Sequence, residues 1–279
     1  ITMGQQPLYS AEEIQKYRDG SDPLFGNANH PKDLFTSGSG FQRSHNLNFS
    51  GGSENTKYFA SMAYLNQEGL VKRNELDRYT LTFNVDQKVS KNLNLGINII
   101  GIKGHSTEPV PTAGPFGANA SVASTVRMLY QMANLLSPTI PGRYPDGSYG
   151  YDGFNSALAA IDSKSFHSQD KHDLIGSVNL GWDITRSLKI SGKAGYVYNQ
   201  GYSKTFNATF KYNENLTQGP AWLREDISNY TSVTLQSLLE YNKKFGDHTV
   251  YGLAGVSQQS DQSTRHNMSR SDFPSNETT

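Results

Sequence analysis

Several features of ordinary soluble enzymes are missing from this sequence of 279 residues. Cysteine is absent, which excludes disulfide bonds, thiolate metal sites and a cysteine nucleophile. Basic and acidic residues cancel at 25 each, so no overall field attracts nucleic acid or an anionic membrane surface. No stretch approaches the roughly 18 consecutive apolar residues that a membrane-spanning helix needs.

What the chain does contain is glycine and aromatic residues in quantity. There are 26 glycines, 16 tyrosines and 13 phenylalanines, although hydrophobic residues make up only 35% of the total. Glycine and aromatics without long apolar runs are typical of barrel strands and the loops between them. A barrel crosses a membrane with alternating strands, which average hydropathy does not detect.

The alternation is clearest over residues 79–86, where Tyr79, Leu81, Phe83 and Val85 share one face of a strand. Thr80, Thr82, Asn84 and Asp86 share the opposite face, which is the two-residue period of a half-buried strand. The same period recurs along the chain. We therefore expect eight strands, at about 43–50, 56–66, 79–86, 93–99, 174–184, 188–199, 233–242 and 249–257.

Short and long connections alternate between these strands. Short turns are expected near residues 51–55, 90–92, 186–187 and 246–248, and longer connections at about 67–77, 105–167 and 200–230. Short periplasmic turns and long extracellular loops are the pattern of outer-membrane barrels. We expect residues 1–42 to be an extracellular loop segment, 43–257 the barrel strands, and 258–279 the start of a further loop. Both ends then lie on the long-loop side, which favours a segment of something larger.

Two of these loop regions should carry helices. Ser10 and Glu13 have the spacing of a capping box, which predicts a short helix to about Asp19. Residues 121–136 place Val126, Leu129 and Met132 on one side, which predicts an amphipathic helix over the mouth of the barrel with that side packed on protein.

Residues 44–59, SHNLNFSGGSENTKYF, closely resemble the SusC/RagA family of TonB-dependent outer-membrane transporters. The similarity continues through residues 64–69 (YLNQEG), 77–79 (DRY) and 86–93 (DQKVSKNL). Two loop segments are also similar, residues 144–149 (YPDGSY) and 273–275 (FPS). The resemblance covers about the whole chain.

This resemblance implies an antiparallel transmembrane β-barrel segment, about eight strands of a larger, 22-stranded wall in the outer membrane. It implies import of a glycan, oligosaccharide or peptide, without enzymatic chemistry and without a cofactor. It further implies a SusD-like surface lipoprotein as partner, and a TonB complex that acts through a plug domain not found in these residues.

The sequence shows no catalytic constellation and no metal site, because its histidines lack a second ligand at strand or helix spacing. Aromatic side chains in the long loops are candidates for substrate binding, although packing of the loops against each other is the simpler reading: Tyr144, Tyr149, Tyr151, Phe154 and Trp222. Aromatics near strand ends are candidates for the membrane girdles: Tyr79, Trp182, Tyr196, Tyr198 and Tyr241.

Four charged residues are expected to face the barrel interior, namely Asp86, Lys189, Lys193 and Glu240. A charge on the lipid face would cost about 2–4 kcal/mol at the membrane midplane, whereas interior water or protein can solvate it.

Two other functions are open at this point. Eight is an allowed strand number for a small closed barrel, which would act as a structural protein or adhesin. A soluble β-sandwich that binds carbohydrate would also give alternating strands, although its loops would not alternate so regularly in length.

Overall fold

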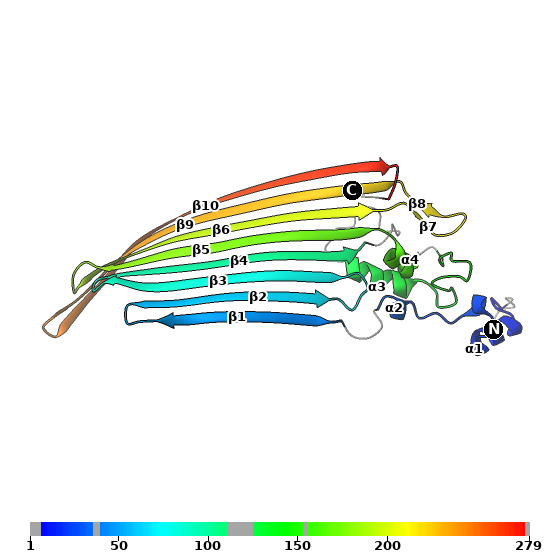
Figure 1. Ribbon diagram of the computed structural model, residues 1–279, viewed down its shortest axis with the longest axis horizontal. Helices are drawn as coiled ribbons and strands as arrows, with labels where there is room; N and C mark the ends of the chain where they lie inside the picture. The colour runs from blue at the N-terminus through cyan, green and yellow to red at the C-terminus, as the bar shows by residue number, and fades with distance from the viewer. Residues whose placement is uncertain (1–6, 36–39, 111–124, 153–155, 277–279) are drawn as a thin grey trace.

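The structure is a computed structural model that describes residues 7–35, 40–110, 125–152 and 156–276. Eight long strands lie side by side in one bent sheet, with the helices gathered at one end (Figure 1). Neighbours in the sheet are antiparallel and follow chain order. The strands are β1 (Gln42–Gly52), β2 (Thr56–Glu68), β3 (Glu75–Ser90), β4 (Leu93–Pro109), β5 (Phe166–Asp183), β6 (Leu188–Asn207), β9 (Ala221–Phe245) and β10 (His248–Phe273).

This sheet is open. Within the described ranges, β1 and β10 each pair on one side only and do not pair with each other. The one other sheet described is a two-stranded hairpin of β7 (Phe210–Lys211) and β8 (Thr217–Gln218). The eight strands thus form neither a closed ring nor two facing sheets, which are the arrangements that the alternative readings require.

Connections at the two ends of the sheet differ in length, as expected. At the short-turn end, the hairpins close over residues 53–55, 91–92, 184–187 and 246–247. The last of these turns uses Gly246 at φ 59°, a left-handed conformation that glycine adopts without steric strain. At the long-loop end, the connections are residues 69–74, 110–165 and 208–220.

The strands extend further toward the long-loop end than the alternation predicted. Strand β10 continues to Phe273, so most of residues 258–279, expected as a loop, are strand. Likewise β6 reaches Asn207 and β9 begins at Ala221, which shortens the loop expected at 200–230. The apolar alternation stops earlier because side chains on both faces there are polar, as in residues 258–267.

The longest strands are much longer than a membrane is thick. About 9–11 residues suffice for a tilted strand to cross the hydrocarbon. Strand β10 has 26 residues, about 85 Å at 3.3 Å per residue. The long-loop half of such a strand must therefore stand outside any bilayer that the other half crosses.

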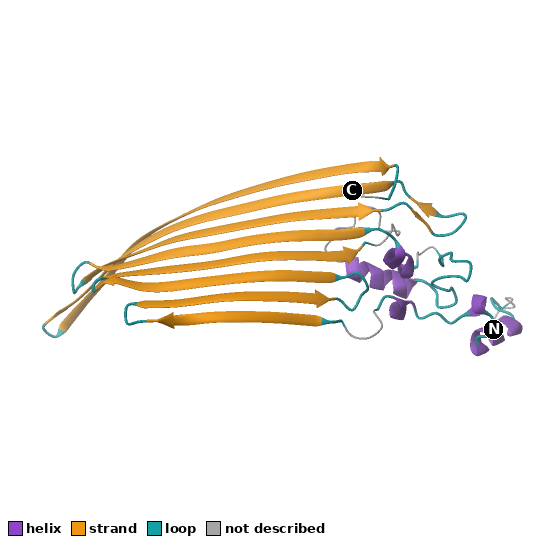
Figure 2. Ribbon diagram, in the orientation of Figure 1, coloured by secondary structure: helices purple, strands orange, loops and turns teal. Residues whose placement is uncertain are grey.

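The helices lie at the long-loop end of the sheet, with the most N-terminal one set apart from the other three (Figure 2). Helix α1 (Ala11–Asp19) begins at the expected capping box, in which the Glu13 amide donates to Ser10 Oγ and the Ser10 amide donates to Glu13 Oε2. Three more helices are α2 (His30–Asp33), α3 (Thr125–Leu135) and α4 (Ala157–Asp162). No helix in the described ranges has the length and apolar character needed to cross a membrane.

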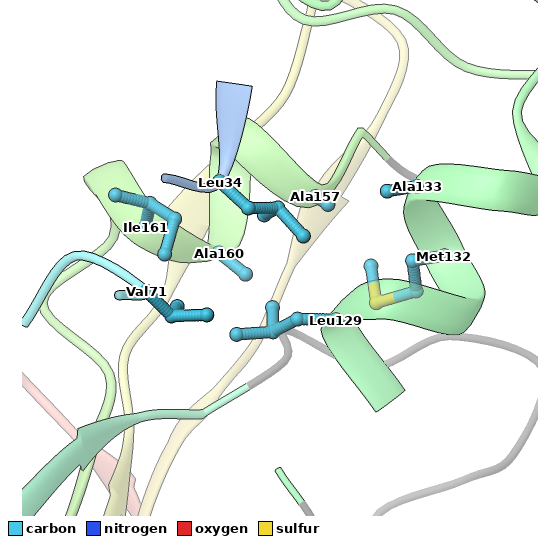
Figure 3. Close-up of a cluster of buried hydrophobic side chains, with 8 residues drawn as sticks. All are labelled: Leu34, Val71, Leu129, Met132, Ala133, Ala157, Ala160 and Ile161. Carbon is cyan, nitrogen blue, oxygen red and sulfur yellow. The ribbon is translucent and has the colours of Figure 1, made fainter. Parts of the chain in front are cut away.

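Helix α3 is the amphipathic helix expected at 121–136, whose first four residues lie outside the described ranges. Leu129 and Met132 are buried, with Val126 packed beside them, against Leu34, Val71, Ala157, Ala160 and Ile161 (Figure 3). This cluster joins α2, the β2–β3 loop, α3 and α4 into one small core. The expected packing of the Val126, Leu129 and Met132 side is therefore confirmed.

Candidate functional site

One face of the sheet is apolar across its breadth. Cross-strand partners share a face, and the register aligns Leu93, Trp182, Ile190 and Leu239 on four neighbouring strands. The same face carries Leu81, Phe83, Ile97, Ile99, Val178 and Leu235. Many of these side chains are exposed, among them Leu81 at 56% and Leu235 at 51%. So large a contiguous apolar surface is foreign to a soluble monomer and fits contact with lipid.

All five aromatics expected in the membrane girdles lie on this apolar face. Trp182 and Tyr241 lie near the short turns, whereas Tyr79 and Tyr198 lie further toward the long-loop end. Tyr79, Trp182 and Tyr196 are 51%, 48% and 41% exposed. Their rings thus stand at two levels of the same surface, the arrangement that two interfacial girdles require.

The opposite face is polar and carries the four charges expected to point inward. Asp86 lies across from Lys57, and Lys189 lies directly across from Glu240. Lys57, Asp86, Lys189 and Lys193 line a hollow of about 620 Å³ near the short-turn end. The alternation thus assigned these side chains to the correct face.

A second hollow, of about 740 Å³, lies on the polar face at the long-loop end, beneath α3. It is lined by Ser106, Glu108, His167, Gln169 and Ser203 of the sheet, and by Val126 and Arg127 of the helix. A smaller hollow of about 230 Å³ continues from Gln169 and Ser203 to Arg224, Asp226 and Arg265. Helix α3 therefore covers the polar face rather than the apolar one, and the two hollows together make a polar basin at the mouth.

The polar basin is held open by hydrogen bonds within the sheet. His167 Nδ1 lies 2.9 Å from Thr205 Oγ1. Arg224 donates two hydrogen bonds, of 2.8 and 3.0 Å, to the Asp226 carboxylate. Because these partners lie on neighbouring strands or two residues apart on one strand, the sheet itself fixes the basin. Spacing along the chain gave no signal of the basin, which depends on strand register.

The loop aromatics take different positions. Tyr149 is buried, packed with Ala159, Tyr212 and Phe210, so its ring serves the core of the loops and offers no face to a ligand. Tyr144 is half-buried, and Tyr151 is 49% exposed beside a hollow lined by Asp146 and Asn213. Phe154 lies outside the described residues.

Trp222 was expected in a loop, but it lies at the start of β9. Its cross-strand partners are Asn207 and Ser271, which places it on the polar face, two residues from Arg224. The sequence shows no sustained apolar alternation around Trp222, because this end of β9 extends beyond the part of the strand that contacts lipid. Among the expected aromatics, Trp222 lies on the same face as the basin.

Burial and hydrogen bonding set the chemistry of Tyr149. Its hydroxyl donates to Asp162 Oδ2 at 2.8 Å and accepts from Arg143 at 2.9 Å. Burial, followed by the bond to Asp162, raises the pKa of Tyr149 to about 12. The phenol is therefore a neutral structural link between the 143–149 turn and α4. This role requires tertiary contacts that the sequence does not display.

Arg73 was also missed by the sequence. It lies in the β2–β3 loop in the left-handed conformation, with φ 63°. Its guanidinium donates to the backbone oxygens of Ile161, Ser163 and Ser165. Burial lowers the pKa of Arg73 from its ordinary value, with Asp162 acting in the opposite direction. We name residues 156–165, which contain α4, the loop cap. Arg73 thus ties the loop cap to the β2–β3 loop, at the long-loop end of β3.

Metal binding has no support in the part of the chain that the structure describes, because no three His, Asp or Glu side chains gather there as a ligand set. A continuous apolar face, a polar opposite face and long connections at one end define a class of protein. The chain is part of the wall of an antiparallel transmembrane β-barrel, with helix-bearing loops at one end.

Comparison with known proteins narrows this class. No protein-family model matches the chain. It is 27% identical over 258 residues to TonB-dependent receptor P3 of Formosa agariphila, which covers 90% of this chain and 25% of that protein. It is 35% identical over 231 residues to TonB-dependent receptor P26 of the same organism, which covers 76% and 20%. The chain therefore spans about a fifth to a quarter of the curated relatives it matches.

A solved structure of the RagAB peptide importer in its closed-closed state has the same fold, with a TM-score of 0.71 at 17% identity. The match covers 98% of this chain and 32% of that chain. The resemblance to SusC/RagA-type TonB-dependent transporters, stated from the sequence, is thus confirmed for a segment of the barrel. The relatives are receptors and importers by name, not enzymes.

Proposed function

We propose that this chain forms wall and loops of a TonB-dependent outer-membrane transporter, which imports a glycan, oligosaccharide or peptide together with a SusD-like lipoprotein. The observation that carries the proposal is the two-faced sheet whose polar side leads into the basin under α3. In this proposal the apolar face contacts lipid and the polar face lines the lumen. The long-loop end faces the outside of the cell.

The site residues have roles within this proposal. Tyr79, Trp182, Tyr196, Tyr198 and Tyr241 form the girdles at the two interfaces. Trp222 and the polar basin contact cargo as it passes the mouth, because aromatic faces and paired polar groups suit sugars and peptides alike. Tyr144 and Tyr151 add contacts above the basin. Asp86, Lys189, Lys193 and Glu240 face the lumen, where water or the plug domain solvates them.

The orientation is tested with single cysteines, which the chain itself lacks. In the full-length receptor on intact cells, a membrane-impermeant maleimide should label Ser148→Cys in the 110–165 loop. It should label Asn55→Cys, in the β1–β2 turn, only after the outer membrane is opened. Labelling of Asn55→Cys on intact cells, with Ser148→Cys protected, would reverse the orientation.

Transport is tested by deleting the full-length receptor and measuring uptake of labelled oligosaccharides and peptides, with a TonB-deficient strain as control. We expect both strains to lose uptake of the same cargo class, and receptor re-expression to restore it. Deletion of the SusD-like partner lipoprotein should also lower uptake of that cargo class. Unchanged uptake of every oligomer in the receptor deletion would refute the proposal.

A further inference from the structure

Three cations stand in one row across the polar face, separated by very small residues. Strand register aligns six residues as successive partners from β3 to β10: Arg78, Gly104, Lys171, Gly201, Ser228 and Arg265. We name these six residues the cationic row. They lie between the hollow under α3 and the membrane-crossing part of the strands, and Gly201, Ser228 and Arg265 also line the smaller hollow of the basin.

The spacing of the row keeps its three cations well apart. Strands lie about 4.8 Å apart, so Arg78 and Lys171, two strands apart, are separated by about 10 Å. Lys171 and Arg265, three strands apart, are separated by about 14 Å. Gly104 and Gly201 place no side chain between them. A Cβ at Gly104 would have only the Asp77 carbonyl oxygen near it, at 3.8 Å, so the floor of the row is open there.

The nearest acids on this face already have partners. Asp173 accepts from Lys171 at 3.2 Å and from Asn199 at 2.8 Å. Asp226 accepts from Arg224 and from Asn267. Across the described ranges, no carboxylate lies within ion-pair distance of the Arg78 or Arg265 guanidinium. Of the three positive charges in the row, that of Lys171 is thus paired with Asp173, whereas among the described residues the two arginine guanidinium groups have no carboxylate partner.

A guanidinium presents paired N–H donors that match a carboxylate in two parallel hydrogen bonds. The two guanidinium groups lie five strands apart, about 24 Å, with the Lys171 ammonium between them, and this spacing suits a linear oligomer with repeated carboxylates. An extended peptide covers 10 Å with about three residues. We propose that the cationic row is a binding track for a carboxylate-bearing oligomer, which selects acidic cargo at the mouth of the transporter. This inference rests on the proposed transport function and specifies its cargo.

The experiment uses the full-length receptor, purified in detergent. Binding is measured by calorimetry for an oligoglutamate peptide and for an acidic oligosaccharide built of uronic acids, each against its neutral counterpart. We expect one acidic probe to bind at least tenfold more tightly than its neutral counterpart, and which one binds identifies the backbone of the cargo. The preference should weaken with added salt.

Three variants locate the effect. The double variant Arg78→Gln/Arg265→Gln should lower acidic affinity about tenfold or more, and Gly104→Glu, which puts a negative charge in the open gap, should do the same. Lys103→Gln is the matched control, because Lys103 adjoins Gly104 on β4 but lies on the apolar face, in register with Tyr79. It should leave binding unchanged. Each variant is first shown to be folded by its heat-modifiable migration on a gel.

Two failures are distinguishable. If neutral oligomers are bound and imported with the same affinity and rate as acidic ones, and the row variants behave like Lys103→Gln, the cationic row is not a binding track, but the proposed transport function is unaffected. If the receptor neither binds nor imports any oligomer, the proposed function itself fails.

Discussion

Removing the Arg73 side chain should release the loop cap from the sheet. Arg73 donates to three backbone oxygens, and two of the acceptor residues, Ser163 and Ser165, are 3% and 0% exposed. A hydrogen bond from a charged donor contributes about 1.5–3 kcal/mol. Water replaces part of this loss at a half-buried site. We therefore expect Arg73→Ala to destabilise the docked cap by about 3–4 kcal/mol.

The left-handed backbone at Arg73 allows the side-chain effect to be separated from strain. A non-glycine residue there costs about 1–2 kcal/mol, which glycine avoids. Arg73→Gly should therefore destabilise the cap by about 1 kcal/mol less than Arg73→Ala. Arg73→Lys keeps the charge but lacks the planar fork, so it should fall between the wild type and Arg73→Ala.

The assay is hydrogen exchange of the full-length receptor in detergent, followed over residues 156–165. Opening of the cap governs exchange there, so a loss of 3–4 kcal/mol corresponds to exchange roughly 100- to 1,000-fold faster. Lys72→Ala is the matched control, because within the described residues the Lys72 ammonium donates one hydrogen bond, to the Asp33 carbonyl oxygen at 3.2 Å. Equal exchange in Arg73→Ala and Lys72→Ala would refute the reasoning.

Three further perturbations test other parts of the structure. Val178→Lys puts a charge on the apolar face at a cost of about 2–4 kcal/mol, so it should lower the amount of folded receptor in the outer membrane. Asn179→Lys, on the polar face, should assemble normally. Equal amounts of folded receptor on a heat-modifiability gel would contradict the assignment of faces. Leu129→Ala should weaken packing of α3 by about 2–5 kcal/mol and expose residues 125–152 to protease on intact cells, while exposed Gln131→Ala should not. In an ultraviolet titration, Tyr149 should stay protonated until about pH 12. Because its pKa in the folded state is raised above 10.0, its contribution to stability is present below pH 10 and is lost as the pH rises toward 12. Titration of Tyr149 near pH 10 would contradict its role as a buried link.

The sequence predicted the structure best where lipid imposes a pattern. Tyr79, Leu81, Phe83 and Val85 must all suit hydrocarbon while their neighbours do not, so the two-residue period is visible without any alignment. The same alternation correctly predicted that Asp86 and Lys193 lie on the polar face. The helix at Leu129 was also visible, because one side of it must be buried.

Prediction failed where the strands extend beyond the region that contacts lipid. Residues 258–267 have polar side chains on both faces, so nothing in their order distinguishes a strand from a loop. Trp222 looked like a loop residue because no sustained apolar alternation follows Leu223. The cationic row joins residues from six strands across nearly 190 positions, from Arg78 to Arg265, and only the register brings them together. Tyr149 and Arg73 depend on contacts with α4 that their own neighbours do not indicate.

The strands lengthen steadily across the sheet, from 11 residues in β1 to 26 in β10. Through the register, Gln42 of β1 lies in the row of Asn267 and Gly52 in the row of Ser257, so β10 runs six residues further at the long-loop end and nine residues further at the short-turn end. At the long-loop end, the edge of the sheet therefore rises by about 20 Å from β1 to β10, at 3.3 Å per residue. This added length carries Trp222 on its polar face, further toward the long-loop end than any residue of β1. Shortening β9 and β10 equally, while keeping their turn, should shorten the dwell time of captured cargo and leave the membrane-crossing part of the wall intact.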